Sequence, residues 1–155
     1  MLRIVLAVLH LLALGIGLGA IFARARALDR LRTTPDALRP AMTADAFWGV
    51  AAVLWISTGL WRAIAGTEKA SSYYWGNHVF RAKMGLLALV LLLELWPMIT
   101  LARWRRAAGR GTPPAPEVLG ATGRRLARVS DVQTLLIVAI VTAAVMMARG
   151  YGARG

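Results

Sequence analysis

The ionisable side chains of His10, Lys83 and Glu94 lie well inside apolar stretches of this sequence, where a charge is costly. On membrane-insertion scales a charge at the centre of a helix costs about 2.5–3.5 kcal/mol, so such side chains should face a helix-bundle interior, a partner or a cofactor rather than lipid. A neutral imidazole in an apolar site is a good ligand for haem iron or another transition metal. A lysine beside it can carry a proton or bind an anion, which makes Lys83 the candidate catalytic residue.

Lys83 and Glu94 belong to one apolar stretch, residues 79–101, and are eleven positions apart. At 100° per residue, two helical positions with this spacing lie on nearly the same face, about 16 Å apart along the axis. We therefore expect both side chains to point from one helix into the same bundle interior.

The elements that must position these residues follow from the composition. The chain has 155 residues, of which 58% are hydrophobic, and they gather in runs at residues 4–22, 46–65, 79–101 and 132–148. A helix needs about 20 residues, at 1.5 Å each, to cross a hydrocarbon core of about 30 Å. The sequence therefore predicts an all-α fold, an integral membrane four-helix bundle that forms a single transmembrane domain over residues 1–155.

The distribution of positive charge predicts how the bundle is oriented. The formal net charge is +12, and two connections carry most of the arginines: five lie in residues 24–39 and seven in residues 103–128, against six Lys or Arg at the other end. By the positive-inside rule both termini should lie outside and the basic loops in the cytoplasm, as in a multi-pass protein of the bacterial inner membrane. The lipid bilayer and anionic lipid head groups are then the expected partners, and no motif suggests nucleic acid.

Local signals refine the helix boundaries. The first run resembles a signal peptide, but its length, its histidine and the arginines that follow it favour a retained helix. Thr34-Pro35-Asp36 indicates a short surface helix, and Pro97 should kink the third span. The glycine- and proline-rich residues 109–123 are expected to form a loop, with the fourth span capped at Ser130-Asp131.

Small and aromatic residues suggest how the spans pack. Gly17 lies seven residues after His10, on nearly the same helix face, where the missing side chain leaves room for a bulky group such as a cofactor. In the second run Trp48, Trp55 and Arg62 recur every seven residues on one face. That face is either a packing seam or an aromatic wall beside a flat ligand.

Counting residues from the expected helix ends predicts two polar layers. His10 and Lys83 fall about 6–9 Å beneath the outer interface, and Arg62 could join them. Glu94, Arg24 and Gln133 form a deeper, inner layer. The alternatives remain that His10 only hydrogen-bonds a neighbouring helix, that Lys83 reaches out to the surface, and that Arg24–Glu94 is a structural ion pair.

Two resemblances accompany these residues. The stretches LHLLALGIGLGAIFARARAL, FWGVAAVLWISTGLWR and KMGLLALVLLLELWPM look like a group of bacterial membrane proteins that carry a domain of unknown function. More distantly, a histidine early in the first span and a lysine opening the third are similar to HemJ-type protoporphyrinogen oxidases and CopD-like membrane domains.

The HemJ resemblance implies haem b bound through His10, which would be the metal ligand. It also implies a redox function in which Lys83 binds a propionate or donates a proton. Gly17, Trp55 and Arg62 would complete the cofactor site. The chain departs from the HemJ pattern at Glu94, where that family tends to have a histidine, and at Ser130–Thr134 in the fourth span.

Three classes of function remain: a haem-binding redox protein, a non-catalytic membrane subunit and a small transporter. Whether the chain is an enzyme stays open. A homo-oligomer or a larger membrane complex is compatible with each class. The absence of cysteine excludes disulfides and thiolate-bound metals.

Overall fold

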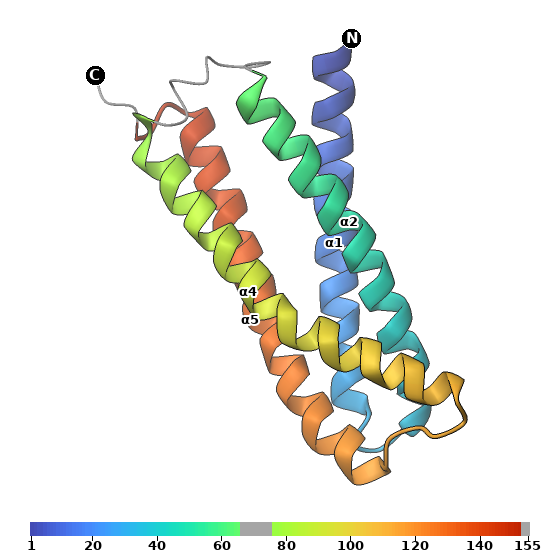
Figure 1. Ribbon diagram of the computed structural model, residues 1–155. Coiled ribbons are helices and arrows are strands. Elements are labelled where there is room, and N and C mark those ends of the chain that lie inside the picture. Colours follow the sequence, from blue (N-terminus) through green and yellow to red (C-terminus); the bar gives the residue numbers. More distant parts are fainter. Residues whose placement is uncertain (66–75, 153–155) are drawn as a thin grey trace.

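The computed structural model describes residues 1–65 and 76–152, and within these ranges it contains helices and no strand. The long helices are α1 (Leu2–Arg30), α2 (Leu38–Ile64), α4 (His78–Gly109) and α5 (Pro116–Ala148), and a single 3-10 turn, η1 (Pro35–Ala37), precedes α2 (Figure 1). All four long helices have the length and apolar composition needed to cross a membrane. The prediction of an all-α four-helix bundle is confirmed.

The helices extend well beyond the apolar runs that predicted them. With 29 residues, α1 is about 43 Å long, which exceeds a hydrocarbon core of about 30 Å. The added turns are rich in alanine, leucine and arginine, which are good helix formers. The boundaries expected from hydropathy were therefore too short, because hydropathy marks the lipid-facing part of a helix and not its ends.

The largest correction concerns the start of the last helix. α5 begins at Pro116, with Glu117 in its first turn, and not at Ser130-Asp131. Proline at the first helical position and an acidic residue near the positive end of the helix dipole explain this start. Only residues 110–115 of the expected loop lie outside helices. Gly123 lets α1 and α5 approach closely, since a Cβ there would lie 2.8 Å from the Leu28 carbonyl oxygen.

Two helix pairs, α1–α2 and α4–α5, build the bundle. α1 packs extensively against both α2 and α5, and α4 packs against α5, whereas α2 and α4 scarcely touch. Figure 1 shows the pairs close together near the α1–α2 and α4–α5 connections and spread apart toward the end where the N-terminus lies. α4 contains Pro97 and bends sharply near its middle, as expected for a proline that removes a helical hydrogen bond.

The first turn of α4 is fixed at the open end. The Asn77 side chain accepts hydrogen bonds from the backbone amides of Val79 (2.9 Å) and Phe80 (3.2 Å), and it donates one to the Tyr151 carbonyl oxygen (3.1 Å). Asn77 thereby caps α4 and ties it to the chain that follows α5. This cap sets the position of Lys83, which lies a turn and a half further along α4.

The core has two apolar clusters with a polar layer between them. One surrounds Ile21, Trp48 and Val90, and the other surrounds Leu28 and Leu101 near the connections. Arg24 follows Ile21 by one turn and precedes Leu28 by one turn, so it lies between the two clusters. The predicted inner polar layer falls at this level.

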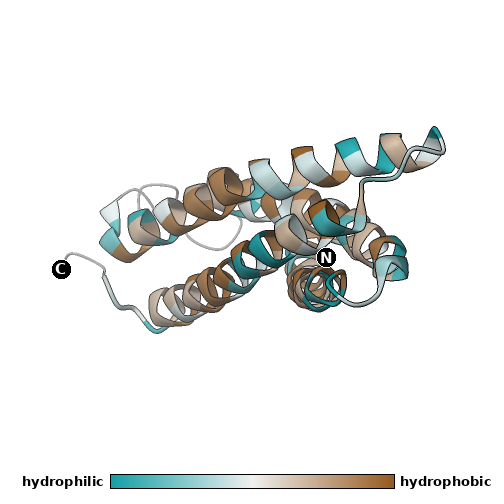
Figure 2. Cartoon of the chain, turned by 90° about the horizontal axis from the view of Figure 1, so that it is seen from below, coloured by the Kyte–Doolittle hydropathy of each residue, from teal (hydrophilic) through white to brown (hydrophobic). Residues whose placement is uncertain are grey.

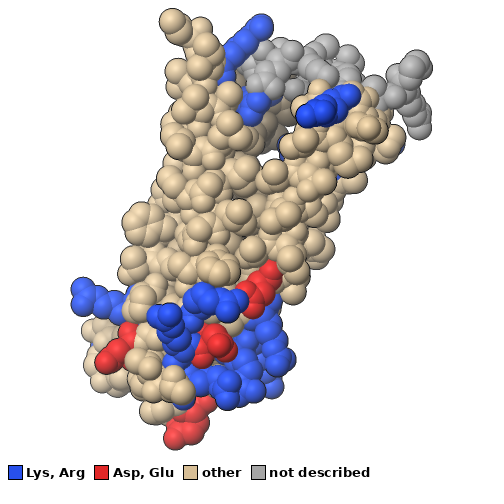
Figure 3. All heavy atoms as spheres, turned by 180° about the vertical axis from the view of Figure 1, so that it is seen from behind, with Lys and Arg blue, Asp and Glu red and all other residues tan. Residues whose placement is uncertain are grey.

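The surface is that of a membrane protein. Large hydrophobic side chains are exposed on every long helix, and hydrophobic colouring runs along the helices in Figure 2. On the face that Figure 3 shows, charged residues gather at the end with the two connections, and an uncharged belt separates them from a smaller group at the opposite end. An uncharged belt between charged ends is the arrangement a bilayer requires.

Candidate functional site

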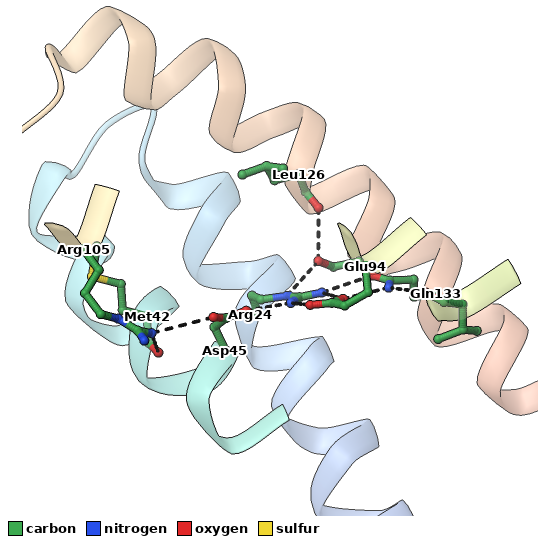
Figure 4. A network of polar contacts seen from close by, with 9 residues as sticks. Arg24, Met42, Asp45, Glu94, Arg105, Leu126 and Gln133 are labelled. Atoms are coloured by element: carbon green, nitrogen blue, oxygen red, sulfur yellow. Dashed lines mark hydrogen bonds and ion pairs between the residues drawn. The ribbon is translucent and has the colours of Figure 1, made fainter. Parts of the chain in front are cut away.

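The inner polar layer is centred on Arg24 of α1, whose side chain is fully buried. Its guanidinium donates through Nη1 to Glu94 Oε1 (2.6 Å) and Asp45 Oδ1 (2.8 Å), through Nη2 to Glu94 Oε2 (2.8 Å) and Gln133 Oε1 (3.0 Å), and through Nε to Ser130 Oγ (3.1 Å) (Figure 4). These contacts use all five N–H donors of an arginine.

The acceptors around Arg24 are themselves held in place. Gln133 donates through Nε2 to Glu94 Oε2 (2.8 Å) and to the Val90 carbonyl oxygen (3.1 Å), and Ser130 donates to the Leu126 carbonyl oxygen (3.0 Å). The second oxygen of Asp45 lies 3.7 Å from Arg105 Nη2. One cluster thus joins α1, α2, α4 and α5 through satisfied polar groups, which is the condition under which a buried charge is tolerated.

The structure brings together the three residues expected in the inner layer, Arg24, Glu94 and Gln133. Sequence reasoning missed Asp45, and it missed Ser130 because that residue was interpreted as a helix cap. A usable signal existed for Ser130, since it lies three residues before Gln133 and therefore on the same helix face. Arg26, two residues after Arg24, pairs instead with Asp131 at 3.3 Å on the surface.

A second polar region lies at the open end of the bundle, where side chains from all four long helices line a cavity of about 420 Å³. His10 of α1, Trp55 and Arg62 of α2, and Lys83 of α4 all line this cavity, and α5 contributes apolar residues. The expected outer layer is therefore brought together in space. Among the described lining residues there is no acidic side chain, so the cavity combines apolar walls with positive charge.

His10 is held against α2 by two neighbouring residues. Its Nδ1 lies 3.0 Å from Thr58 Oγ1, and that hydroxyl lies 2.6 Å from the Leu54 carbonyl oxygen. If the hydroxyl proton is directed to the carbonyl oxygen, Thr58 Oγ1 accepts from Nδ1, and the corresponding neutral tautomer of the ring carries its lone pair on Nε2. A Cβ on Gly59 would lie 2.8 Å from His10 Cε1, so glycine is needed for the ring to fit.

Thr58 and Gly59 were not predicted to contact His10. They follow Trp55 by three and four residues, which places them on the same helix face as that tryptophan. The interaction of His10 with a neighbouring helix, one of the alternatives considered, is thus present. The same histidine also lines the cavity, so the two interpretations do not exclude each other.

Trp55 forms part of the wall beside His10. The two rings have centroids 6.1 Å apart and are tilted by 34°, within the range of aromatic contacts. The indole Nε1 is buried and has no hydrogen-bond partner among the described residues. A buried donor without an acceptor costs about 1–3 kcal/mol, and it is the type of group that a bound polar ligand can satisfy.

A family model described as "Predicted membrane protein (DUF2214)" matches residues 2–152. The chain belongs to this family. No curated protein and no solved structure matches it. The DUF2214 description agrees with the four spans, and membership in the family assigns no activity.

In this DUF2214 chain, Gly17 does not lie where the prediction of a cofactor site placed it. It does not line the cavity, and the bulky group beside it belongs to the protein, since a Cβ there would lie 3.2 Å from Trp48 Cζ3 and 3.4 Å from Ala51 Cβ. The seven-residue spacing correctly placed Gly17 on an inward face. It did not show that Trp48 of α2 already fills the space, so Gly17 is a packing residue.

Simple metal coordination finds no support in the described part of the chain, where no group of three or more His, Asp or Glu side chains could hold an ion. Haem iron differs because the porphyrin supplies most of its ligands and the protein adds only one or two axial ones. A single cavity histidine such as His10 is compatible with that class of cofactor.

Proposed function

We propose that this DUF2214 protein binds haem b in the cavity at the open end of the bundle and takes part in membrane redox chemistry. The observation that carries the proposal is the environment of His10, an imidazole that lines the cavity and contacts Thr58 through Nδ1. A hydrogen bond at one ring nitrogen is the usual way in which proteins orient the other toward a metal.

The remaining cavity residues match the apolar ring and the carboxylates of a haem. Its apolar ring requires walls such as Trp55, Leu14 and Ile140, and its carboxylates require cations, which Lys83 and Arg62 supply. The volume of about 420 Å³ lies within the range of small-molecule sites. Haem b would supply one-electron redox chemistry, while Lys83 would bind a carboxylate or deliver a proton.

Orientation and location form part of the proposal. The excess of arginine at the end with the connections favours the cytoplasm for that end and the outer side for both termini. In a bacterial inner membrane, the cavity would then lie in the outer half of the bilayer, and the basic end would contact anionic head groups.

A role as a non-catalytic membrane subunit is the second candidate, and the Arg24 cluster favours it. That cluster holds four helices together without any substrate, and a membrane subunit could need nothing more. A transporter is the weakest candidate. Between the two polar layers Val90, Ile137 and Ile140 are at most 2% exposed, so apolar packing separates the layers in the described bundle.

An absorption spectrum of the protein purified in detergent from haem-replete cells tests the proposal. We expect a Soret band that His10→Ala abolishes. The matched control is His78→Ala, which removes the other histidine, exposed at the start of α4 and absent from the cavity lining. A colourless wild-type protein, or a Soret band unchanged in His10→Ala, would overturn the haem proposal. A colourless protein that co-purifies with a larger complex would support the subunit role.

A further inference from the structure

The cavity has an opening on the side of the bundle, between α2 and α4. A second lobe shares His10, Trp55 and Lys83 with the first, and its outer residues are Ile56 and Leu60 of α2 and Met84 and Leu87 of α4. Leu60 is 50% exposed and Met84 is 36% exposed. Because α2 and α4 scarcely touch, no contact between these two described helices closes this side.

In the membrane placement proposed above, the residues at this opening would face the acyl chains of the bilayer. Leu60 lies four residues before the end of α2 and Leu87 nine residues after the start of α4. At 1.5 Å per residue, the opening therefore extends from about 6 Å to about 14 Å below the helix ends. Lipid, and not water, is the medium beside an apolar opening at this depth.

Lys83 gives the opening a preference for negatively charged ligands. Its ammonium group makes no hydrogen bond or ion pair with another described residue, and the described cavity lining holds no acid. An ammonium group between apolar walls is stabilised by an anion that arrives with the ligand. Lys83 lies closer to the start of α4 than Leu87 does, so an anionic head group would meet Lys83 while an apolar body lies against Leu60, Met84 and Leu87.

We propose that the opening between α2 and α4 admits membrane-dissolved amphiphiles with a carboxylate, which enter sideways from the bilayer and pair with Lys83. This inference rests on the proposed function only in taking the cavity as a ligand site. It goes further by naming the class of ligand and the route of entry, and it holds whether or not the ligand is haem.

A fatty acid with bromine atoms on its chain is a suitable probe, because bromine quenches a tryptophan that it contacts. In proteoliposomes, the quenching that is lost on Trp55→Phe reports arrival of the probe at the cavity wall. We expect this Trp55-dependent quenching when the acid is added to the wild type. We expect the apparent affinity for the acid to be at least fivefold weaker in Lys83→Met. The uncharged methyl ester should likewise bind the wild type at least fivefold more weakly than the acid does. Running the same series in His10→Ala prevents a bound haem from masking the probe.

The route is tested by closing the opening. Because the chain has no cysteine, Leu60→Cys/Met84→Cys can be bridged by a short bis-maleimide reagent, with the monofunctional N-ethylmaleimide as the matched control. We expect bridging to slow Trp55 quenching at least tenfold and the control reagent to leave it nearly unchanged. Quenching unaffected by the bridge overturns lateral entry, and equal quenching by acid and ester overturns the role of Lys83. A colourless protein that still shows both effects would refute haem and retain this inference.

Discussion

Arg24 and Glu94 form a two-point ion pair, with Nη1 2.6 Å from Oε1 and Nη2 2.8 Å from Oε2. The pair links α1 to α4 across the centre of the bundle, and Asp45, Ser130 and Gln133 complete it from the other helices (Figure 4). This cluster holds the four helices together near the α1–α2 and α4–α5 connections. The cavity lies at the other end of the bundle, where α2 and α4 separate.

Removing the central arginine should be strongly destabilising. Arg24→Met leaves Glu94 and Asp45 without their buried partner, and breaking one side of a buried pair typically costs about 3–5 kcal/mol. We expect a large fall in the thermal unfolding midpoint in detergent.

The matched control is Arg26→Met, two residues further along α1. Its pair with Asp131 is about half exposed on both sides, so its loss should cost less than about 1 kcal/mol. If the two variants unfolded at the same temperature, the Arg24 cluster would not be the element that locks the bundle.

Gly59→Ala should disturb His10. The added Cβ would meet His10 Cε1 at 2.8 Å, so the ring must move away from Thr58. Under the haem proposal we expect a weaker or shifted Soret band together with a lower unfolding midpoint.

Gly49→Ala on the same helix provides the comparison, because nothing lies within 4 Å of its added Cβ. There the higher helix propensity of alanine should be neutral or stabilising by up to about 1 kcal/mol. Equal behaviour of the two alanine variants would argue against a tight fit between Gly59 and the imidazole.

The proposed orientation of the protein in the membrane can be tested by labelling single-cysteine variants, since the chain has no cysteine of its own. Thr112→Cys, in the α4–α5 connection, should resist a membrane-impermeant maleimide applied to intact spheroplasts and react after lysis. Tyr151→Cys, near the other end, should react in both preparations. The reverse labelling pattern would invert the topology and place the cavity on the cytoplasmic side.

Much of the fold could be predicted because the lipid environment imposes simple rules. Apolar run length gave the number of spans, and Pro97 marked the bend in α4. The start of α5 was missed because glycine and proline suggest a loop. Here Pro116 occupies the first helical turn, and Gly123 serves a close contact with α1.

The sequence allowed us to predict which residues lie in each polar layer, but only part of the contacts that they make. Depth along each helix placed Arg24 near Glu94 and His10 near Lys83, since depth depends only on residue count. The rotation of one helix against another is not encoded in that count. For this reason Thr58 and Asp45 were missed as partners, and Gly17 was assigned to a cofactor although Trp48 occupies its space.

The claim that His10 is an axial ligand is tested most directly by replacing its side chain from solution. His10→Gly should lose the Soret band of the wild type, and added imidazole should restore it by binding in the vacated space, while His78→Gly keeps the band without any addition. A His10→Gly protein that retains its Soret band, or a wild type that never shows one, would contradict the account.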